Sequence, residues 1–218
     1  MIKEIRALFL NELTIEWRQK NATFSILLYV VSTVFVCYLS IKRVIDIPTW
    51  NALFWIIILF TSINAVSKSF SGYTKGKWLY LYSIASPQAV IISKILYNSL
   101  LLSLFACISL FFYSTFLGNP INNLLLFLIT ILLGCVGISS ILVLMSAIAS
   151  KAESNMTLLA VLSFPLILPL LMVIQTLSKS AIDGLAFSVY INYLLITGAI
   201  DVIVVALSFM LFPYLWQD

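Results

Sequence analysis

Long apolar stretches separated by short polar segments dominate the sequence. Charge-free windows cover residues 22–41, 47–67 and 95–150. A transmembrane helix needs about 20 mostly apolar residues, so the third window is too long for a single crossing. Its centre, residues 118–123, reads Gly-Asn-Pro-Ile-Asn-Asn, which is a cluster of turn residues. The pattern therefore predicts two spans joined by a tight hairpin in this window.

The C-terminal third of the chain holds two further apolar windows, residues 156–177 and 185–216. The second contains Asp201 near its middle and allows two interpretations. Either residues 185–196 lie at the interface or re-enter, which leaves residues 198–214 as the final span, or one long helix carries a buried carboxylate. A charge at mid-bilayer costs roughly 2.5–3.5 kcal/mol on insertion scales, and this cost favours the first interpretation.

The first twenty residues mix charges with apolar residues at a regular spacing. Ile5, Phe9, Leu13 and Trp17 recur every four residues and share one helical stripe. This predicts an amphipathic helix at the membrane interface. The whole chain, 1–218, is then one all-α integral membrane domain. Its expected spans are residues 22–41, 47–67, 95–117, 124–149, 156–177 and 198–214, with a cytoplasmic loop at 68–94.

Composition excludes several classes of function. Hydrophobic residues make up 62% of the chain and charged residues 9%, and there is no histidine. Soluble domains carry about 25% charged residues, so no soluble catalytic domain fits in the chain. Histidine is the commonest general base and a common ligand of metals and haem iron. We therefore expect no catalytic residue, no metal site and no directly bound cofactor.

The distribution of basic residues predicts the orientation in the membrane. With six spans both termini lie on one side, and cytoplasmic loops carry an excess of Lys and Arg. One side carries Lys3, Arg6, Arg18, Lys20, Lys68, Lys75, Lys77, Lys94 and Lys151, and the other carries Lys42, Arg43 and Lys179. Both termini are therefore expected in the cytoplasm. The net charge of +4 reflects this topology, and no nucleic-acid partner is expected.

The cytoplasmic loop contains an apolar, aromatic run at residues 78–85, bounded by Gly76 and Pro87. The run is long enough for about two helical turns that either dock a partner or rest on the membrane. The segment beginning at Gly72 resembles a phosphate-binding loop only superficially. Three residues separate Gly72 from Gly76, and Trp78 replaces the hydroxyl residue that would hold magnesium. The chain is not expected to hydrolyse nucleotide.

Three other features are candidates for function. Pro165 and Pro169 interrupt the hydrogen-bond ladder of the fifth span on one face, which predicts a kink, a hinge or a gate. Asp201 is an intramembrane ionisable residue and raises the hypothesis of an ion or proton pathway. Gly134 and Gly137 form a patch of small residues that favours close helix packing. Many aromatic residues near span ends, Trp50, Trp55, Tyr113, Tyr190, Tyr193, Tyr214 and Trp216 among them, are expected in interfacial belts.

Three stretches resemble ABC-2-type permeases, and more closely the haem exporter protein B (CcmB) family. They are the segment Arg6-Ala-Leu-Phe-Leu-Asn-Glu-Leu at the start, the set Phe70, Gly76, Pro87 and Lys94 in the loop, and residues 162–171 around the two prolines. The resemblance implies a type V exporter-like bundle in a bacterial inner membrane.

The resemblance also implies a role and partners. The chain would be the non-catalytic membrane subunit of an ABC transporter for cytochrome c maturation. ATP would bind a partner ATPase, and the complex would handle haem through a tryptophan-rich subunit, with a small accessory subunit and a second copy of this chain. The implied ATPase contacts are Gly76, Lys77, Trp78, Leu79, Tyr80 and Pro87. The alternatives are a permease for a lipid, polymer or drug, and a stand-alone carrier built around Asp201.

Overall fold

The computed structural model describes residues 1–18, 20–40, 45–66, 68–71, 81, 85–151 and 156–217. Its elements over these ranges are helical: α1 (Ile2–Arg18), α2 (Lys20–Ser40), α3 (Ile47–Val66), α4 (Lys68–Ser71), α6 (Pro87–Leu117), α7 (Leu124–Lys151), α8 (Met156–Asp183) and α9 (Phe187–Gln217). Within the described ranges six helices, α2, α3 and α6 to α9, are long and apolar enough to cross a membrane. The predicted class, an all-α integral membrane protein, is confirmed.

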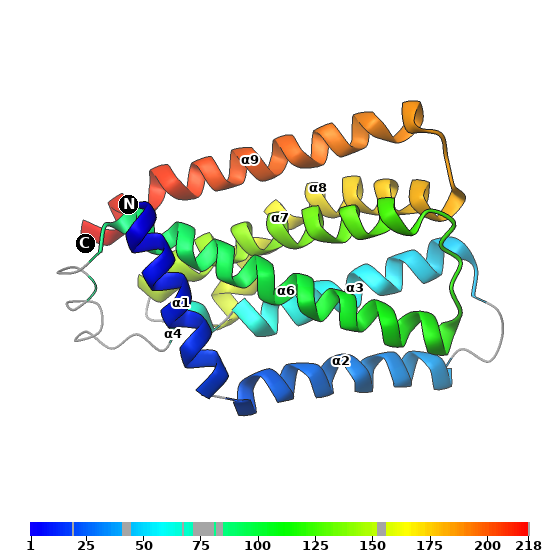
Figure 1. Cartoon of the computed structure of the whole chain (residues 1–218), viewed down its shortest axis with the longest axis horizontal. Coiled ribbons are helices and arrows are strands. Elements are labelled where there is room, and N and C mark those ends of the chain that lie inside the picture. The colour runs from blue at the N-terminus through cyan, green and yellow to red at the C-terminus, as the bar shows by residue number, and fades with distance from the viewer. Residues whose placement is uncertain are drawn as a thin grey trace.

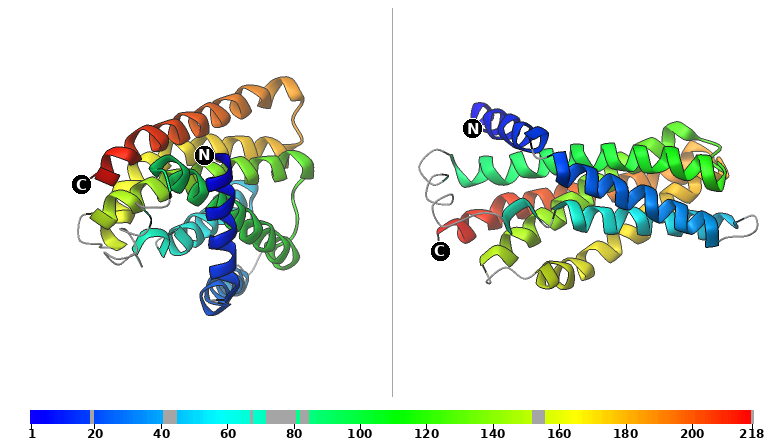
Figure 2. Two further views of the ribbon diagram at one scale, coloured as in Figure 1. Left: turned by 60° about the vertical axis from the view of Figure 1, so that its left-hand side comes forward. Right: turned by 90° about the horizontal axis from the view of Figure 1, so that it is seen from below.

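The six long helices form one elongated bundle, and α1 runs across one end of it at a steep angle (Figure 1; Figure 2). Both chain termini lie at this same end, which we call the terminal end. The turns between α6 and α7 and between α8 and α9 lie at the opposite end, which we call the turn end. Helix α1, which was predicted to lie at the interface, therefore runs in a different direction from the six long helices.

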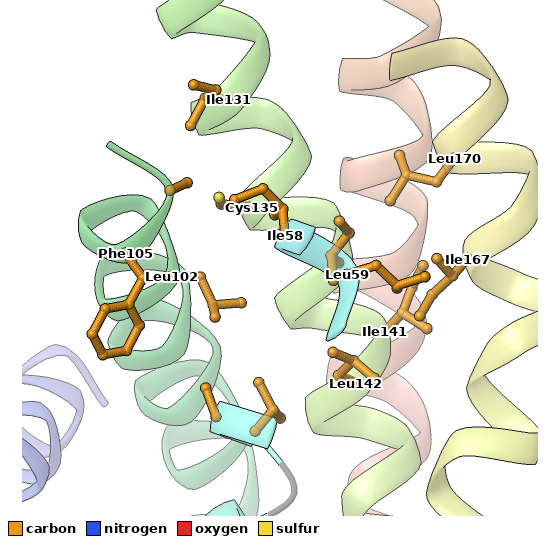
Figure 3. Close-up of a cluster of buried hydrophobic side chains, with 14 of the residues drawn as sticks. Ile58, Leu59, Leu102, Phe105, Ile131, Cys135, Ile141, Leu142, Ile167 and Leu170 are labelled. Carbon is orange, nitrogen blue, oxygen red and sulfur yellow. The ribbon is translucent and has the colours of Figure 1, made fainter. Parts of the chain in front are cut away.

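Helix α7 forms the centre of the bundle. It contacts α3, α4, α6, α8 and α9 and is buried over most of its length, whereas α2 and α9 present most of their apolar side chains outward. The core around it is a layer of aliphatic and aromatic side chains from four helices (Figure 3). Its members include Ile58, Leu59, Leu102, Phe105, Ile131, Cys135, Ile141, Leu142, Ile167 and Leu170.

Local sequence explains both turns at the turn end. Helix α6 ends before Gly118, which adopts φ 85°, and Asn123 Oδ1 accepts a hydrogen bond from the Leu126 N–H (3.1 Å) at the start of α7. Helix α8 ends before Gly184, at φ 66°, and the Leu185 N–H bonds back to the Ser180 carbonyl (3.1 Å). This is the glycine-terminated motif that closes many helices. The hairpin predicted at residues 118–123 is present.

Two helices are longer than the spans predicted for them. The third span was predicted from residue 95, and α6 begins at Pro87, because proline suits the first turn of a helix and Lys94 finds a carboxylate partner inside the fold. The last region was expected to break near residue 198, but α9 is one continuous helix through Asp201. The alternative interpretation, one long helix with a buried carboxylate, is the one observed.

Candidate functional site

Two carboxylates of α1 bind the first turns of α6 at the terminal end. Glu4 Oε2 accepts hydrogen bonds from the Ser86 backbone N–H (3.1 Å) and from the Ser86 hydroxyl (2.8 Å). Glu12 Oε1 accepts one from Lys94 Nζ (2.9 Å). Each pair is separated by 82 positions, so the two contacts follow each other in the same order along both segments. We call this pair of contacts the α1–α6 clamp.

Lys94 is the most buried charge of the clamp. Its side chain is 4% exposed and that of Glu12 is 22% exposed. Nζ also donates to the Ser69 carbonyl oxygen (2.7 Å) and lies 4.8 Å from the centroid of the Phe70 ring. A buried ammonium needs both a counter-charge and hydrogen-bond acceptors, and this site supplies them, with an added cation–π contact.

The predicted coupling loop, residues 68–94, begins in α4 and ends in the first turns of α6. Ser69, in α4, accepts a hydrogen bond from Lys94 at the end of this range, and Ser86, directly before Pro87, donates to Glu4. The hydroxyl of Ser86 turns toward α1 and caps no N–H of its own helix. Four hydrogen bonds therefore connect Ser69, Ser86 and Lys94 with one another or with α1 at this end of the bundle.

The residues expected to contact an ATPase fall largely outside the described ranges. Gly76, Lys77, Trp78, Leu79 and Tyr80 belong to this group. Pro87 is described and occupies the first position of α6. The structure thus places the two attachment points of the loop and leaves the docking prediction as a prediction.

The pKa of the Glu4 carboxyl, at the terminal end, is well below its ordinary value. Its bond to the N-terminal ammonium, at 2.9 Å, and then its bonds to Ser86 lower the pKa of the carboxyl to about 2. Hydrogen bonds and a neighbouring positive charge both favour the ionised form. The Glu4 carboxylate is therefore ionised at any physiological pH and can accept the hydrogen bonds from Ser86 throughout this range.

From the sequence, Lys94 was expected on the cytoplasmic side and in the family resemblance, whereas Glu4 and Glu12 were given no role in the fold. Three members of the predicted apolar stripe, Ile5, Phe9 and Leu13, are half-buried, and the side chain of the fourth, Trp17, lies outside the described part of the chain. Glu4 and Glu12 directly precede two residues of that stripe, Ile5 and Leu13. Acidic residues that flank an apolar stripe are the signal that could have revealed the clamp.

Asp201 lies deep inside the bundle on α9 and is 5% exposed. Its carboxylate packs against Gly137 of α7, and a Cβ atom at that position would overlap Asp201 Oδ1 and come within 2.7 Å of Leu170 Cδ2 on α8. Neither carboxylate oxygen has a hydrogen-bond partner among the described residues. Asp201 therefore sits where three helices meet, and it depends on a glycine for its space.

The small-residue patch on α7 serves packing within the chain. A Cβ atom at Gly134 would lie 2.7 Å from Trp55 Cη2, so the glycine makes room for an indole ring. Trp55 Nε1 donates to Ser178 Oγ (2.9 Å), and Ser178 in turn donates to Asn51 Oδ1 (2.7 Å). These bonds tie α3 to α8 beside the central helix.

The expectation of an interfacial aromatic belt was wrong for three residues. Trp50, Trp55 and Tyr113 are 2% exposed or less and form part of the core near the turn end. Trp50 Nε1 donates to the Gly118 carbonyl (3.1 Å) and Tyr113 Oη donates to the Trp50 carbonyl (3.0 Å). Their polar atoms find partners inside the protein, which removes the need for an interfacial position.

Pro165 and Pro169 lie within one continuous helix, α8. Both are exposed on the outer surface of the bundle, next to the exposed side chains of Phe164 and Leu168. The two missing N–H groups weaken the hydrogen-bond ladder on the face that points away from the core. The predicted hinge or gate stays a prediction. Among the described residues no group of three His, Cys, Asp or Glu side chains could hold a metal ion.

The fold and the site define a class: a multi-pass membrane protein whose amphipathic N-terminal helix is hydrogen-bonded to the beginning of α6 at one end of the bundle. The chain matches the model of the CcmB protein family over residues 3–214 and belongs to that family. Membership makes it a membrane subunit of a haem-exporting ABC transporter of cytochrome c maturation, which works with an ATPase partner and other subunits of that system. Comparison with curated proteins gave no match.

Proposed function

We propose that this chain converts closure of the partner ATPase dimer into movement of its own spans. In this mechanism the loop at residues 68–94 docks on the ATPase through Gly76, Lys77, Trp78, Leu79, Tyr80 and Pro87. ATP binds and reacts on the partner. The resulting movement of the spans releases haem-loaded chaperone from a tryptophan-rich partner subunit that handles haem.

The observation that carries this proposal is the α1–α6 clamp. A docking loop transmits force only if its ends are fixed to elements that move as units. One end is fixed through the Ser69 carbonyl and the other through Ser86, and both lead to carboxylates of the same helix, α1. Tilting of the loop would then rotate α1 and the first turns of α6 together, and α6 contacts the central helix α7.

The same arrangement supports a cytoplasmic position for both termini. The termini, α1 and the attachment points of the loop share one end of the bundle (Figure 1). Lys3 and Arg6 are exposed there, where they can meet anionic headgroups. A sequence without histidine is in keeping with haem ligation by a partner rather than by this chain. We further propose that a second copy of this chain and a small accessory subunit complete the complex.

Charge insertion in the docking run tests the proposal. Trp78→Glu places a carboxylate in the proposed apolar contact, whereas Trp78→Phe keeps an aromatic ring and serves as the control. Tagged variants are purified from the native membrane, and the amount of ATPase that accompanies them is measured. We expect the glutamate variant to lose most of the ATPase while its elution in gel filtration is unchanged. Equal ATPase recovery with both variants would refute the contact.

A further inference from the structure

A cavity of about 430 Å³ lies between the elbow of α1 and α2 and the flank of α6. It is almost wholly apolar, and its polar residues are Glu16 of α1, Thr23 of α2 and Tyr97 of α6. The volume falls in the range of roughly 300–1,000 Å³ typical of ligand cavities. The clamp and the proposed docking loop make no use of this space.

The cavity opens toward the bilayer. Phe24, Leu100 and Leu104 line it and are 64%, 49% and 51% exposed, while Phe105 and Tyr97 form its buried floor. The α6 residues from Tyr97 to Phe105 follow two helical turns, about 12 Å of helix length. An occupant can therefore enter sideways from the membrane and lie along α6.

Polar and apolar residues lie in different parts of the cavity. Glu16 belongs to the helix that crosses the terminal end of the bundle, and its carboxylate accepts a hydrogen bond from the Thr23 hydroxyl. Deeper positions, such as Leu101 and Leu104, are apolar. A carboxylate only accepts hydrogen bonds, so the complementary ligand has a cationic, N–H-bearing head and an apolar tail.

We propose that this cavity binds one acyl chain of an aminophospholipid from the leaflet on the side of the termini, with the primary ammonium headgroup on Glu16. Phosphatidylethanolamine is the membrane lipid chemistry that fits. Phosphatidylcholine has the same charge but no N–H donor, and phosphatidylglycerol has no cationic group. The expected order of affinity is therefore ethanolamine, then choline, then glycerol headgroups.

Native mass spectrometry of the delipidated full chain, with the three lipids added in competition at matched acyl length, tests the proposal. The wild-type chain should retain one phosphatidylethanolamine at least about tenfold over phosphatidylglycerol, the factor expected for a charge-assisted hydrogen bond. Equal retention of the three lipids, or preference for phosphatidylglycerol, would overturn the headgroup assignment. This measurement needs no variant and does not depend on the ATPase.

Three substitutions locate the site and test its headgroup contact. Leu104→Trp fills the mouth of the cavity, and Leu207→Trp on α9 is the matched control, because Leu207 is also an exposed apolar residue, at 46%. We expect the first to lose the bound lipid and the second to keep it. Glu16→Gln should keep a bound lipid but lose the preference for ethanolamine over choline. Lipid retention by Leu104→Trp at the wild-type level would place the lipid elsewhere and refute the proposal.

Discussion

Gly137 of α7 and the carboxylate of Asp201 on α9 share one space, because a Cβ atom at position 137 would overlap Asp201 Oδ1. The side chain of Leu170 on α8 closes the same space from the other side, 2.7 Å from that Cβ position. Three membrane helices thus approach one another at a point where one contributes a charge-bearing group and another contributes no side chain. Gly137 therefore leaves the room that the Asp201 side chain occupies inside the bundle.

Gly137→Ala is expected to destabilise the bundle. The added methyl group must displace Asp201 or Leu170, and overpacking of a tight core costs about 1–3 kcal/mol. Gly198→Ala on α9 is the control, because no atom lies within 4 Å of a Cβ at that position. That variant should unfold at the wild-type temperature or slightly above it, since alanine favours helix. The thermal midpoint in detergent is the measurement, and equal midpoints for the two variants would contradict this account.

Asp201→Asn tests whether this carboxylate carries a proton during the transport cycle. The amide has the shape of the carboxylate but does not bind and release a proton, so a carrier built on this residue would stop working. In the proposed mechanism the residue is a packing element, and cytochrome c yield should stay within about twofold of the wild type, well below the effect of a residue essential for turnover. The yield is measured in cells that depend on this chain. Loss of cytochrome c with an unchanged level of protein would show that Asp201 has a role in transport beyond packing.

Breaking the buried ion pair should release α1 from α6. Glu12→Ala leaves Lys94 buried without its counter-charge, and removal of one partner of such a pair costs about 3–5 kcal/mol. The double variant Glu12→Leu with Lys94→Met removes both charges and should recover much of the loss. Cross-linking of a cysteine pair introduced on α1 and α6 reports the contact. If Glu12→Ala cross-links as well as the double variant, the pair does not hold the helix.

The Glu4 contact should resist mild acid. The folded-state pKa of this carboxyl, about 2, is below its ordinary value of 4.5. The contribution of the carboxylate is therefore fully present above pH 4.5 and is lost as the pH falls toward 2. The distance between spin labels attached to α1 and α6 should be the same at pH 7 and pH 5 when Glu4 is present. Glu4→Gln should lengthen this distance at both values, and a lengthening with Glu4 present between pH 7 and 5 would show that another group controls the contact.

Much of the fold follows from hydropathy, because lipid requires long apolar helices and turn residues mark their ends. The hairpin at Gly118 and the apolar stripe on α1 could be predicted from the sequence in this way. The continuity of α9 through Asp201 did not follow, since insertion costs describe a lone helix in lipid whereas Asp201 packs against Gly137 inside the bundle. The position of a charge in a membrane protein depends on neighbours that are distant in sequence.

The α1–α6 clamp could not be predicted from the sequence for the same reason. Lys94 is 82 positions from Glu12, and no local pattern links them. Trp55 likewise resembled an interfacial residue until its partner Ser178, on another helix, was known. Local patterns show which residues can enter the membrane, and only tertiary packing shows which of their polar atoms are paired.

The two prolines of α8 provide the last prediction. Both lie on the outer surface, so alanine at each position removes no core contact and restores two N–H groups to the helix. The double variant Pro165→Ala with Pro169→Ala should therefore assemble normally and unfold at the same or a higher temperature. If the weakened ladder lets α8 bend during the transport cycle, the stiffened helix should block cytochrome c production although the complex is intact. Phe164→Ala, an exposed neighbour without a backbone effect, is the control and should keep full production. Full cytochrome yield in the double variant would reduce the prolines to packing features of a static helix.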